Sequence, residues 1–126
     1  MKSKKNFGFT LIELLVVVAL IGVLSAIGLV AFGGLKESSE KKQAETTLQS
    51  IYLAEQEYKS NNGNYYYNSN TSSIVNNLFD GVDDLSEQNY TFTITGNSNN
   101  DTLCIRATKS GQTTLYLNHQ KKKTNC

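Results

Sequence analysis

The chain divides into an apolar first part and a more polar second part. From Phe9 to Leu35, 20 of 27 residues are apolar, and the 22 residues from Leu14 to Leu35 carry no charge. At 1.5 Å per residue, a helix of that length crosses the hydrocarbon core of a bilayer, which is about 30 Å thick. The pattern therefore predicts a transmembrane helix near the amino terminus.

Helical periodicity continues beyond this apolar segment. Spacings of three and four residues define a stripe on one side of the helix, formed by Ala44, Leu48, Ile51 or Tyr52, Glu55 and Tyr58. Asn61-Asn62-Gly63 is expected to end the helix, with Gly63 in the left-handed conformation that follows many helices. We expect one helix over residues 9–60, with a transmembrane part at 9–35 and an amphipathic part at 36–60.

The polar second part contains three short runs in which apolar residues alternate with polar ones. They are Tyr90–Thr95, Thr102–Lys109 and Thr113–Asn118, and the short linkers between them favour an antiparallel meander. Residues 63–88 are expected to form a loop with one helical turn around Ile74–Phe79. The predicted fold class is α+β: a long amino-terminal helix packed on a small antiparallel meander of about three strands.

Charge and motif content exclude several classes of function. Lys and Arg total 12 and Asp and Glu total 11, a balance that does not indicate a nucleic-acid partner. Gly-rich phosphate loops, paired catalytic carboxylates and zinc-ligand spacings are absent from the sequence, so we expect no enzyme, cofactor or metal site. The acidic turn from Asp80 to Glu87 lacks the EF-hand pattern. The basic run Lys121–Lys123 is expected to be a solvated tail, with a weak DNA contact as the alternative.

Cys104 and Cys126 are the only cysteines in the sequence. Lys2, Lys4 and Lys5 precede the apolar segment and are expected to stay in the cytoplasm, which sends the rest of the chain outward. In an exported domain two cysteines favour a disulfide. The alternative, a reactive thiol with His119 as its base, lacks a third group to orient the base.

Glu13 is the one charged residue within the apolar segment. A carboxylate near the bilayer centre costs about 2.5–3.5 kcal/mol on insertion scales, so its presence needs a reason. Either it lies near enough to the headgroups to reach water, or it is kept for a cationic partner. A chain cut just before Phe9 would supply an amino group, in the same copy or in a neighbouring one.

The amino-terminal motif resembles a known family. Lys4-Lys5-Asn6-Phe7-Gly8 followed by Phe9-Thr10-Leu11-Ile12-Glu13-Leu14 is similar to the class III signal of type IV pilins and pseudopilins. The resemblance implies that residues 1–8 are a leader, removed between Gly8 and Phe9 by a prepilin peptidase that also methylates the Phe9 nitrogen. It further implies that Glu13 pairs with a Phe9 amine during filament assembly.

The resemblance also implies a fold, a function and a set of partners. The fold is the ladle of type IV pilins, with residues 61–126 as a head that contains an αβ-loop, the meander and a C-terminal disulfide loop. The function is a structural subunit of a pilus, inserted in the bacterial inner membrane as a precursor with its C-terminus outside, and extracellular once assembled. Its partners are identical or related pilins, the prepilin peptidase and the pilus assembly platform.

Two alternatives stay open at this point. The chain is a pseudopilin of a type II secretion or DNA-uptake system, or it is an uncleaved, anchored domain that binds a ligand or DNA.

The sequence also departs from the family at Val30, where many members have a proline. Glycines stand in this part of the helix instead, and each weakens a helix interior by about 1 kcal/mol relative to Ala. We expect any bend of this helix in an assembled fibre to lie at one of these glycines. The alternative is that they let neighbouring helices approach closely. The glycines are Gly22, Gly28, Gly33 and Gly34.

Overall fold

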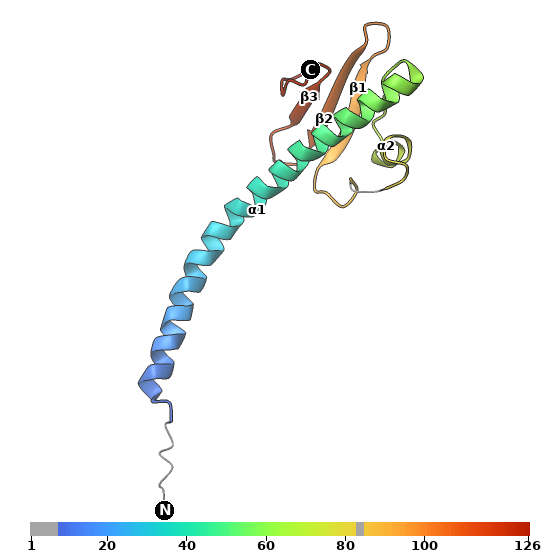
Figure 1. The fold of residues 1–126 in the computed structure, drawn as a ribbon. Coiled ribbons are helices and arrows are strands. Elements are labelled where there is room, and N and C mark those ends of the chain that lie inside the picture. Colours follow the sequence, from blue (N-terminus) through green and yellow to red (C-terminus); the bar gives the residue numbers. More distant parts are fainter. Residues whose placement is uncertain (1–7, 83–84) are drawn as a thin grey trace, which may run out of the picture. The chain divides into compact units, whose positions relative to one another are not determined.

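The computed structural model describes residues 8–82 and 85–126. In chain order the elements are helix α1 (Leu11–Asn62), helix α2 (Thr71–Leu78) and strands β1 (Thr91–Asn97), β2 (Thr102–Thr108) and β3 (Leu115–Asn118), labelled in Figure 1. The chain forms two compact units, residues 1–38 and 39–126, and α1 contributes to both. The expected α+β fold, with a long helix and a three-stranded antiparallel sheet, is confirmed.

The first unit contains the apolar part of α1, and the side chains of this part are exposed in the described portion of the chain. Every Leu, Ile, Val and Phe from Leu11 to Leu35 is at least 50% exposed. Within the described part of the chain, α1 is the one helix long and apolar enough to cross a membrane. Because apolar surface of this extent is unfavourable in water, this part of α1 requires lipid or other helices around it.

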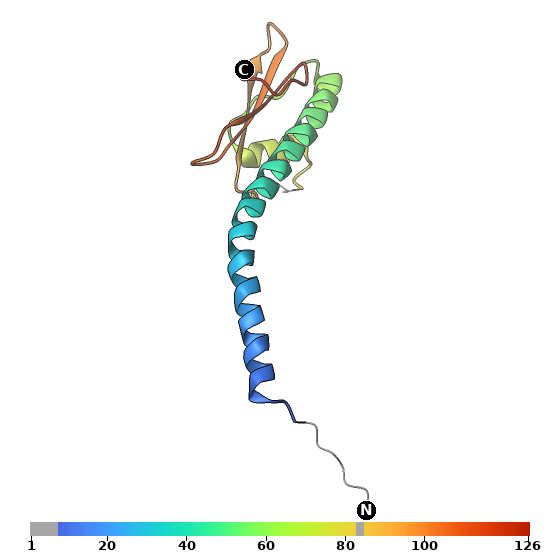
Figure 2. The same cartoon turned by 90° about the vertical axis from the view of Figure 1, so that its left-hand side faces the viewer.

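The second unit is a sheet packed against the later turns of α1. The strand order is β1-β2-β3 and both pairs are antiparallel, with Ile105 of β2 opposite Ile94 of β1 and Leu117 of β3. Figure 2 shows the strands and α1 as two neighbouring layers. The predicted stripe of α1 and the predicted inner face of the meander meet in one buried cluster, which includes Ala44, Leu48, Ile51, Phe92, Ile94, Leu103, Ile105 and Leu117.

Element boundaries differ from the predictions by a few residues, and α2 is longer than expected. We predicted one turn at Ile74–Phe79, whereas the helix begins at Thr71. The reason is its cap: Asn70 Oδ1 accepts hydrogen bonds from the backbone N–H of Ser72 (2.9 Å) and Ser73 (3.4 Å). Gly63 has φ of +85° after α1, as predicted from its position.

The loop between α1 and α2 covers the outer edge of β1. The carbonyl of Asn68 accepts the N–H of Ile94 at 2.8 Å, and the Tyr67 hydroxyl donates to the carbonyl of Thr102 at 3.0 Å. This crossing needs a residue without a side chain at position 96, since a Cβ on Gly96 would lie 2.1 Å from the Thr102 oxygen and 2.5 Å from the Tyr67 ring. Gly96 is therefore required by close approach.

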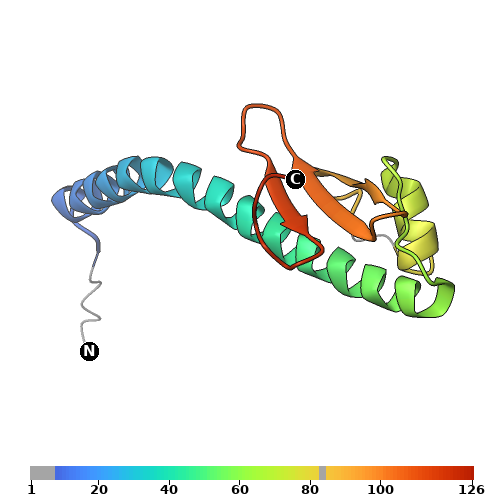
Figure 3. The same cartoon turned by 90° about the horizontal axis from the view of Figure 1, so that it is seen from above.

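The C-terminal segment is fastened to the sheet by the disulfide that the sequence predicted. Cys104 and Cys126 are bonded, with their Cα atoms 5.9 Å apart and a separation of 22 positions in the sequence. The N–H of His119 donates to the carbonyl of Leu103 at 2.9 Å, which extends the β2–β3 pairing by one residue. Figure 3 shows this segment, in red, doubling back beside β3.

Breaking the disulfide is expected to destabilise the head, because the open chain gains conformational freedom when it unfolds. We expect Cys126→Ser to lower the free energy of unfolding by about 3 kcal/mol, measured by chemical denaturation of the full chain in detergent. Reductant should lower the stability of the wild-type chain by a similar amount and leave the variant unchanged. Equal stability of oxidised and reduced wild-type protein would contradict the prediction.

Candidate functional site

The candidate site lies at the start of α1, where the sequence predicted Gly8, Phe9 and Glu13 as functional residues. Gly8 and Phe9 precede the helix without regular structure, and Phe9 is 93% exposed. The peptide bond between them is thus in exposed, non-helical backbone, which is where proteolytic enzymes act most readily. The leader lysines, Lys2, Lys4 and Lys5, lie outside the described residues.

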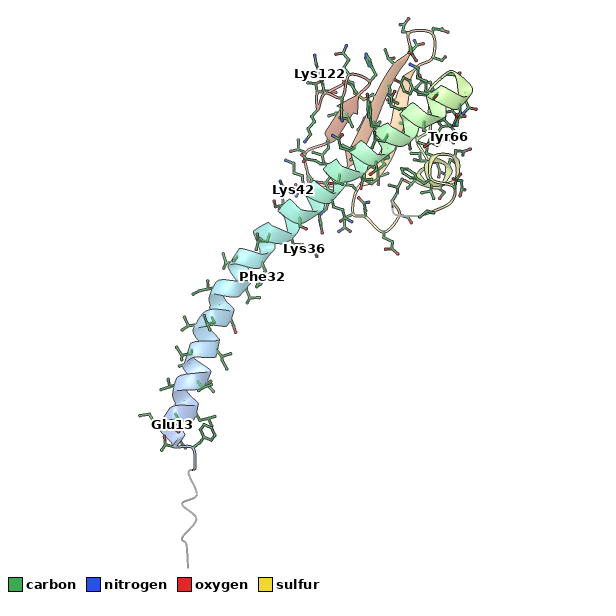
Figure 4. The ribbon with its side chains drawn as sticks, in the orientation of Figure 1. Glu13, Phe32, Lys36, Lys42, Tyr66 and Lys122 are labelled. Atoms are coloured by element: carbon green, nitrogen blue, oxygen red, sulfur yellow. A yellow bond between two sulfur atoms is a disulfide. The ribbon has the colours of Figure 1, made fainter. Side chains whose placement is uncertain are left out.

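Glu13 and Thr10 form a reciprocal capping interaction at the first turn of α1. Glu13 Oε2 accepts a hydrogen bond from the backbone N–H of Thr10 at 3.2 Å, and Thr10 Oγ1 accepts one from the backbone N–H of Glu13 at 3.4 Å. This is a capping box, which satisfies two N–H groups that the helix start leaves without partners. Figure 4 shows Glu13 at this end of α1.

Thr10 is a residue of the candidate site that the sequence analysis did not single out. The signal was present, since Thr10-Leu11-Ile12-Glu13 is the T-x-x-E pattern of a capping box directly before an apolar run. Its effect is to hold the Glu13 carboxylate beside the first turn of its own helix. A carboxylate there is also favoured by the positive end of the helix dipole.

The capping box leaves part of the Glu13 carboxylate available. Only Oε2 is engaged by Thr10, and the Glu13 side chain is exposed. The second oxygen can therefore accept from a cation supplied by another molecule. Between Gly8 and Leu35 Glu13 is the one charged residue, and most of the side chains around it are apolar.

The four helix glycines lie within an uninterrupted α1. A Cβ at Gly22, Gly33 or Gly34 would meet nothing within 4 Å, and one at Gly28 would meet only the Phe32 ring at 3.7 Å. No close contact within the chain requires these glycines. The predicted bend at one of them concerns an assembled fibre and stays a prediction.

The other candidate groups are occupied or incomplete. Both cysteines are in the disulfide, so the alternative of a reactive thiol with His119 is wrong. The carbonyl of His119 instead accepts the Tyr52 hydroxyl at 3.3 Å. Asp83 and Asp84 of the acidic turn lie outside the described residues. Among the residues that are described, no group of three or more His, Cys, Asp and Glu side chains is placed to hold a metal ion.

Glu55 is a second carboxylate on α1, and it is fully buried in the head. Its Oε2 accepts the backbone N–H of Tyr66 at 2.8 Å, which ties the loop after α1 back to the helix. Its Oε1 is buried without a hydrogen-bond partner among the described residues. Burial raises the pKa of this carboxyl to about 7, against the opposing effect of the Tyr66 hydrogen bond.

The amino-terminal region is similar to that of known proteins. Residues 3–29 match the family model of the prokaryotic N-terminal methylation motif. The type IV major pilin protein PilA of Myxococcus xanthus (strain DK1622) is 41% identical over 63 residues, which are 50% of this chain and 29% of that relative. The alignment thus spans less than a third of the relative's length. No solved structure matches the chain.

Glu55 predicts a pH dependence of head stability. Its pKa is about 7 in the folded chain and near 4.5 when unfolded, so the folded state binds more protons between these values. The free energy of unfolding should be highest below pH 4.5 and fall by about 3 kcal/mol as the pH rises through 7. Glu55→Gln keeps the acceptor for Tyr66 N–H and should remove this decline, measured by denaturation from pH 4 to 8. An identical decline in the variant would assign the effect to other groups.

Proposed function

We propose that this chain is a structural subunit of a type IV pilus filament. The premise is the similarity of its amino-terminal region to the type IV pilin family. The observation that carries the proposal is the first part of α1, which is apolar on all sides. The exposed Gly8–Phe9 bond precedes it, and Glu13 accepts the backbone N–H of Thr10 in its first turn. The large apolar side chains of this rod are at least half exposed among the described residues, so they need a partner from outside the chain. A fibre of parallel rods supplies that partner.

The precursor is proposed to lie in the bacterial inner membrane before assembly. The lysines of residues 1–8 stay in the cytoplasm, and the head, whose disulfide fits an oxidising compartment, lies outside. A prepilin peptidase cuts between Gly8 and Phe9 and methylates the new amino terminus. The exposed, non-helical backbone at this bond supports such a cut, because the helix that would shield it begins only at Leu11.

Assembly then exchanges lipid contacts of α1 for contacts with other copies. The pilus assembly platform adds subunits one by one, and the Glu13 carboxylate receives the Phe9 amino group of a neighbouring copy. An unpaired charge among apolar helices is strongly unfavourable, so this pair admits only the register in which both charges meet. The capping box supports this role because it holds the carboxylate in place through Oε2 and leaves the other oxygen for the amine.

A pseudopilin of a type II secretion or DNA-uptake system is the second candidate. It uses the same leader, the same processing and the same apolar helix. The observation in its favour is the extent of the match to the major pilin, which reaches 29% of that protein and leaves most of it unmatched. Electron microscopy of cells that express the chain separates the two, because a major pilin forms long surface fibres.

Processing is tested by mass spectrometry of the chain purified from membranes of its native host. We expect a species that begins at Phe9, lacks residues 1–8 and carries one additional methyl group. In a Gly8→Val variant, the branched side chain should block the cut and leave the leader in place. A wild-type chain that still begins at Met1 would exclude the proposed function.

The role of Glu13 is tested with two variants that separate charge from capping. Glu13→Gln keeps a hydrogen-bond acceptor for Thr10 N–H but removes the charge, and should reduce filament yield at least tenfold with unchanged membrane insertion. Thr10→Ala keeps the charge and loses its half of the cap, which costs about 1 kcal/mol, so the yield should fall less. Normal filament yield from Glu13→Gln would show that charge pairing is not what assembly requires.

A further inference from the structure

The head carries a basic groove between α1 and β3. It has a volume of about 170 Å³ and is lined by Lys41 and Glu45 of α1, by the backbone and side chains of residues 114–117, and by Lys123 of the C-terminal segment. Lys123 pairs with Glu45 at 3.4 Å, which leaves the exposed Lys41 as the net charge of the groove. Lys121 and Lys122 follow β3 on the same segment and are exposed, so they add positive charge next to it.

A second groove, of opposite charge, lies between α1 and α2. It has a volume of about 270 Å³, and its charged lining residues are Glu57 and Asp80, both exposed. Tyr58, Asn61 and Asn77 supply further hydrogen-bonding groups, and no Lys or Arg lines it. Among the described residues, neither carboxylate forms an ion pair. The groove therefore presents two unneutralised negative charges.

The two grooves face nearly opposite sides of α1. At 100° per residue, the α1 positions of the basic groove (41, 45, 48 and 49) and those of the acidic groove (54, 57, 58, 61 and 62) centre about 160° apart. Their centres are also displaced along the helix by roughly 19 Å, at 1.5 Å per residue. In Figure 4, Lys122 lies on the β3 side of α1. Tyr66, whose hydroxyl accepts a hydrogen bond from Asn77 Nδ2 at 3.1 Å, lies on the α2 side.

We propose that the acidic groove of one copy docks against the basic groove and lysine segment of a second copy of this chain. Two different surfaces of one chain then meet in a heterologous contact, which leaves a free groove at each end and so continues from copy to copy. The neighbouring heads lie side by side with a stagger of roughly 19 Å along α1. The inference rests on the proposed function, and names the head surfaces that meet in the fibre.

A second copy fits the basic groove better than a nucleic acid does. Glu45 lines the groove beside Lys123, and a carboxylate there repels a phosphate backbone. It suits a protein partner with mixed polar groups, such as the amides of Asn61 and Asn77 beside Glu57. The same chain also carries one acidic groove for each basic groove, so no second component is needed.

The contact is tested by charge reversal in the full chain, expressed in a host that assembles it. We expect Lys41→Glu and Glu57→Lys each to lower filament yield about five- to tenfold, because like charges then face each other across the contact. The double variant restores opposite charges and should recover at least half of the wild-type yield. Lys42→Glu, an equal change on the same helix that lines neither groove, is the control and should assemble normally.

The readouts distinguish this inference from the proposed function. Wild-type filaments together with full assembly of both single variants, or a double variant no better than the singles, would overturn the contact and leave the pilus assignment standing. Absence of wild-type filaments would overturn both. If either reversal lowers head stability in detergent, Lys41→Gln and Glu57→Gln replace it, with a smaller expected loss. A more than tenfold loss of affinity for a DNA duplex in Lys41→Glu, with assembly unchanged, would assign the groove to a polyanion.

Discussion

The apolar surface of the first part of α1 is the constraint on which the rest of the molecule depends. From Leu11 to Leu35 each Leu, Ile, Val and Phe side chain is at least half exposed, and none of the described residues buries it. Lipid covers such a helix at low cost, and so do other copies of it, whereas water does not. Lipid and a bundle of helices are therefore the two environments that suit this helix. In both of them, a polar group without a hydrogen-bond partner at the helix start is unfavourable. The capping box between Thr10 and Glu13 avoids this by satisfying two backbone N–H groups within the chain.

Most of the fold was predictable because two periodicities in the sequence are clear. The spacing of Ala44, Leu48, Ile51 and Glu55 gave the buried side of α1, and the alternation of Leu103, Ile105 and Ala107 gave the inner face of β2. The length of α2 was not recovered, because its start depends on the Asn70 side chain and its residues are too few for a periodic signal. The disulfide followed from the export argument.

The candidate site was recovered in part. Gly8, Phe9 and Glu13 stood out because a carboxylate within an apolar run demands an explanation, whereas Thr10 did not, since a hydroxyl at the edge of such a run is unremarkable by type. Only the three-residue spacing of Thr10 and Glu13 indicates a capping box. At the start of a helix, that spacing lets each side chain accept the backbone N–H of the other residue. The charged grooves of the head were beyond sequence reasoning for a different reason. Lys41 and Lys123 are 82 positions apart, and only the packing of β3 on α1 brings them together.

Two carboxylates on one helix show how burial decides what an acid does in this protein. Glu13 and Glu55 each accept one backbone N–H, from Thr10 and from Tyr66. Their remaining oxygens differ. That of Glu55 is buried without a hydrogen-bond partner among the described residues, and burial raises the pKa of this carboxyl to about 7. The Glu13 side chain is exposed, and its free oxygen reaches whatever surrounds the helix. In the proposed filament, such an acid would make association selective, because copies packed in another register would leave it unpaired.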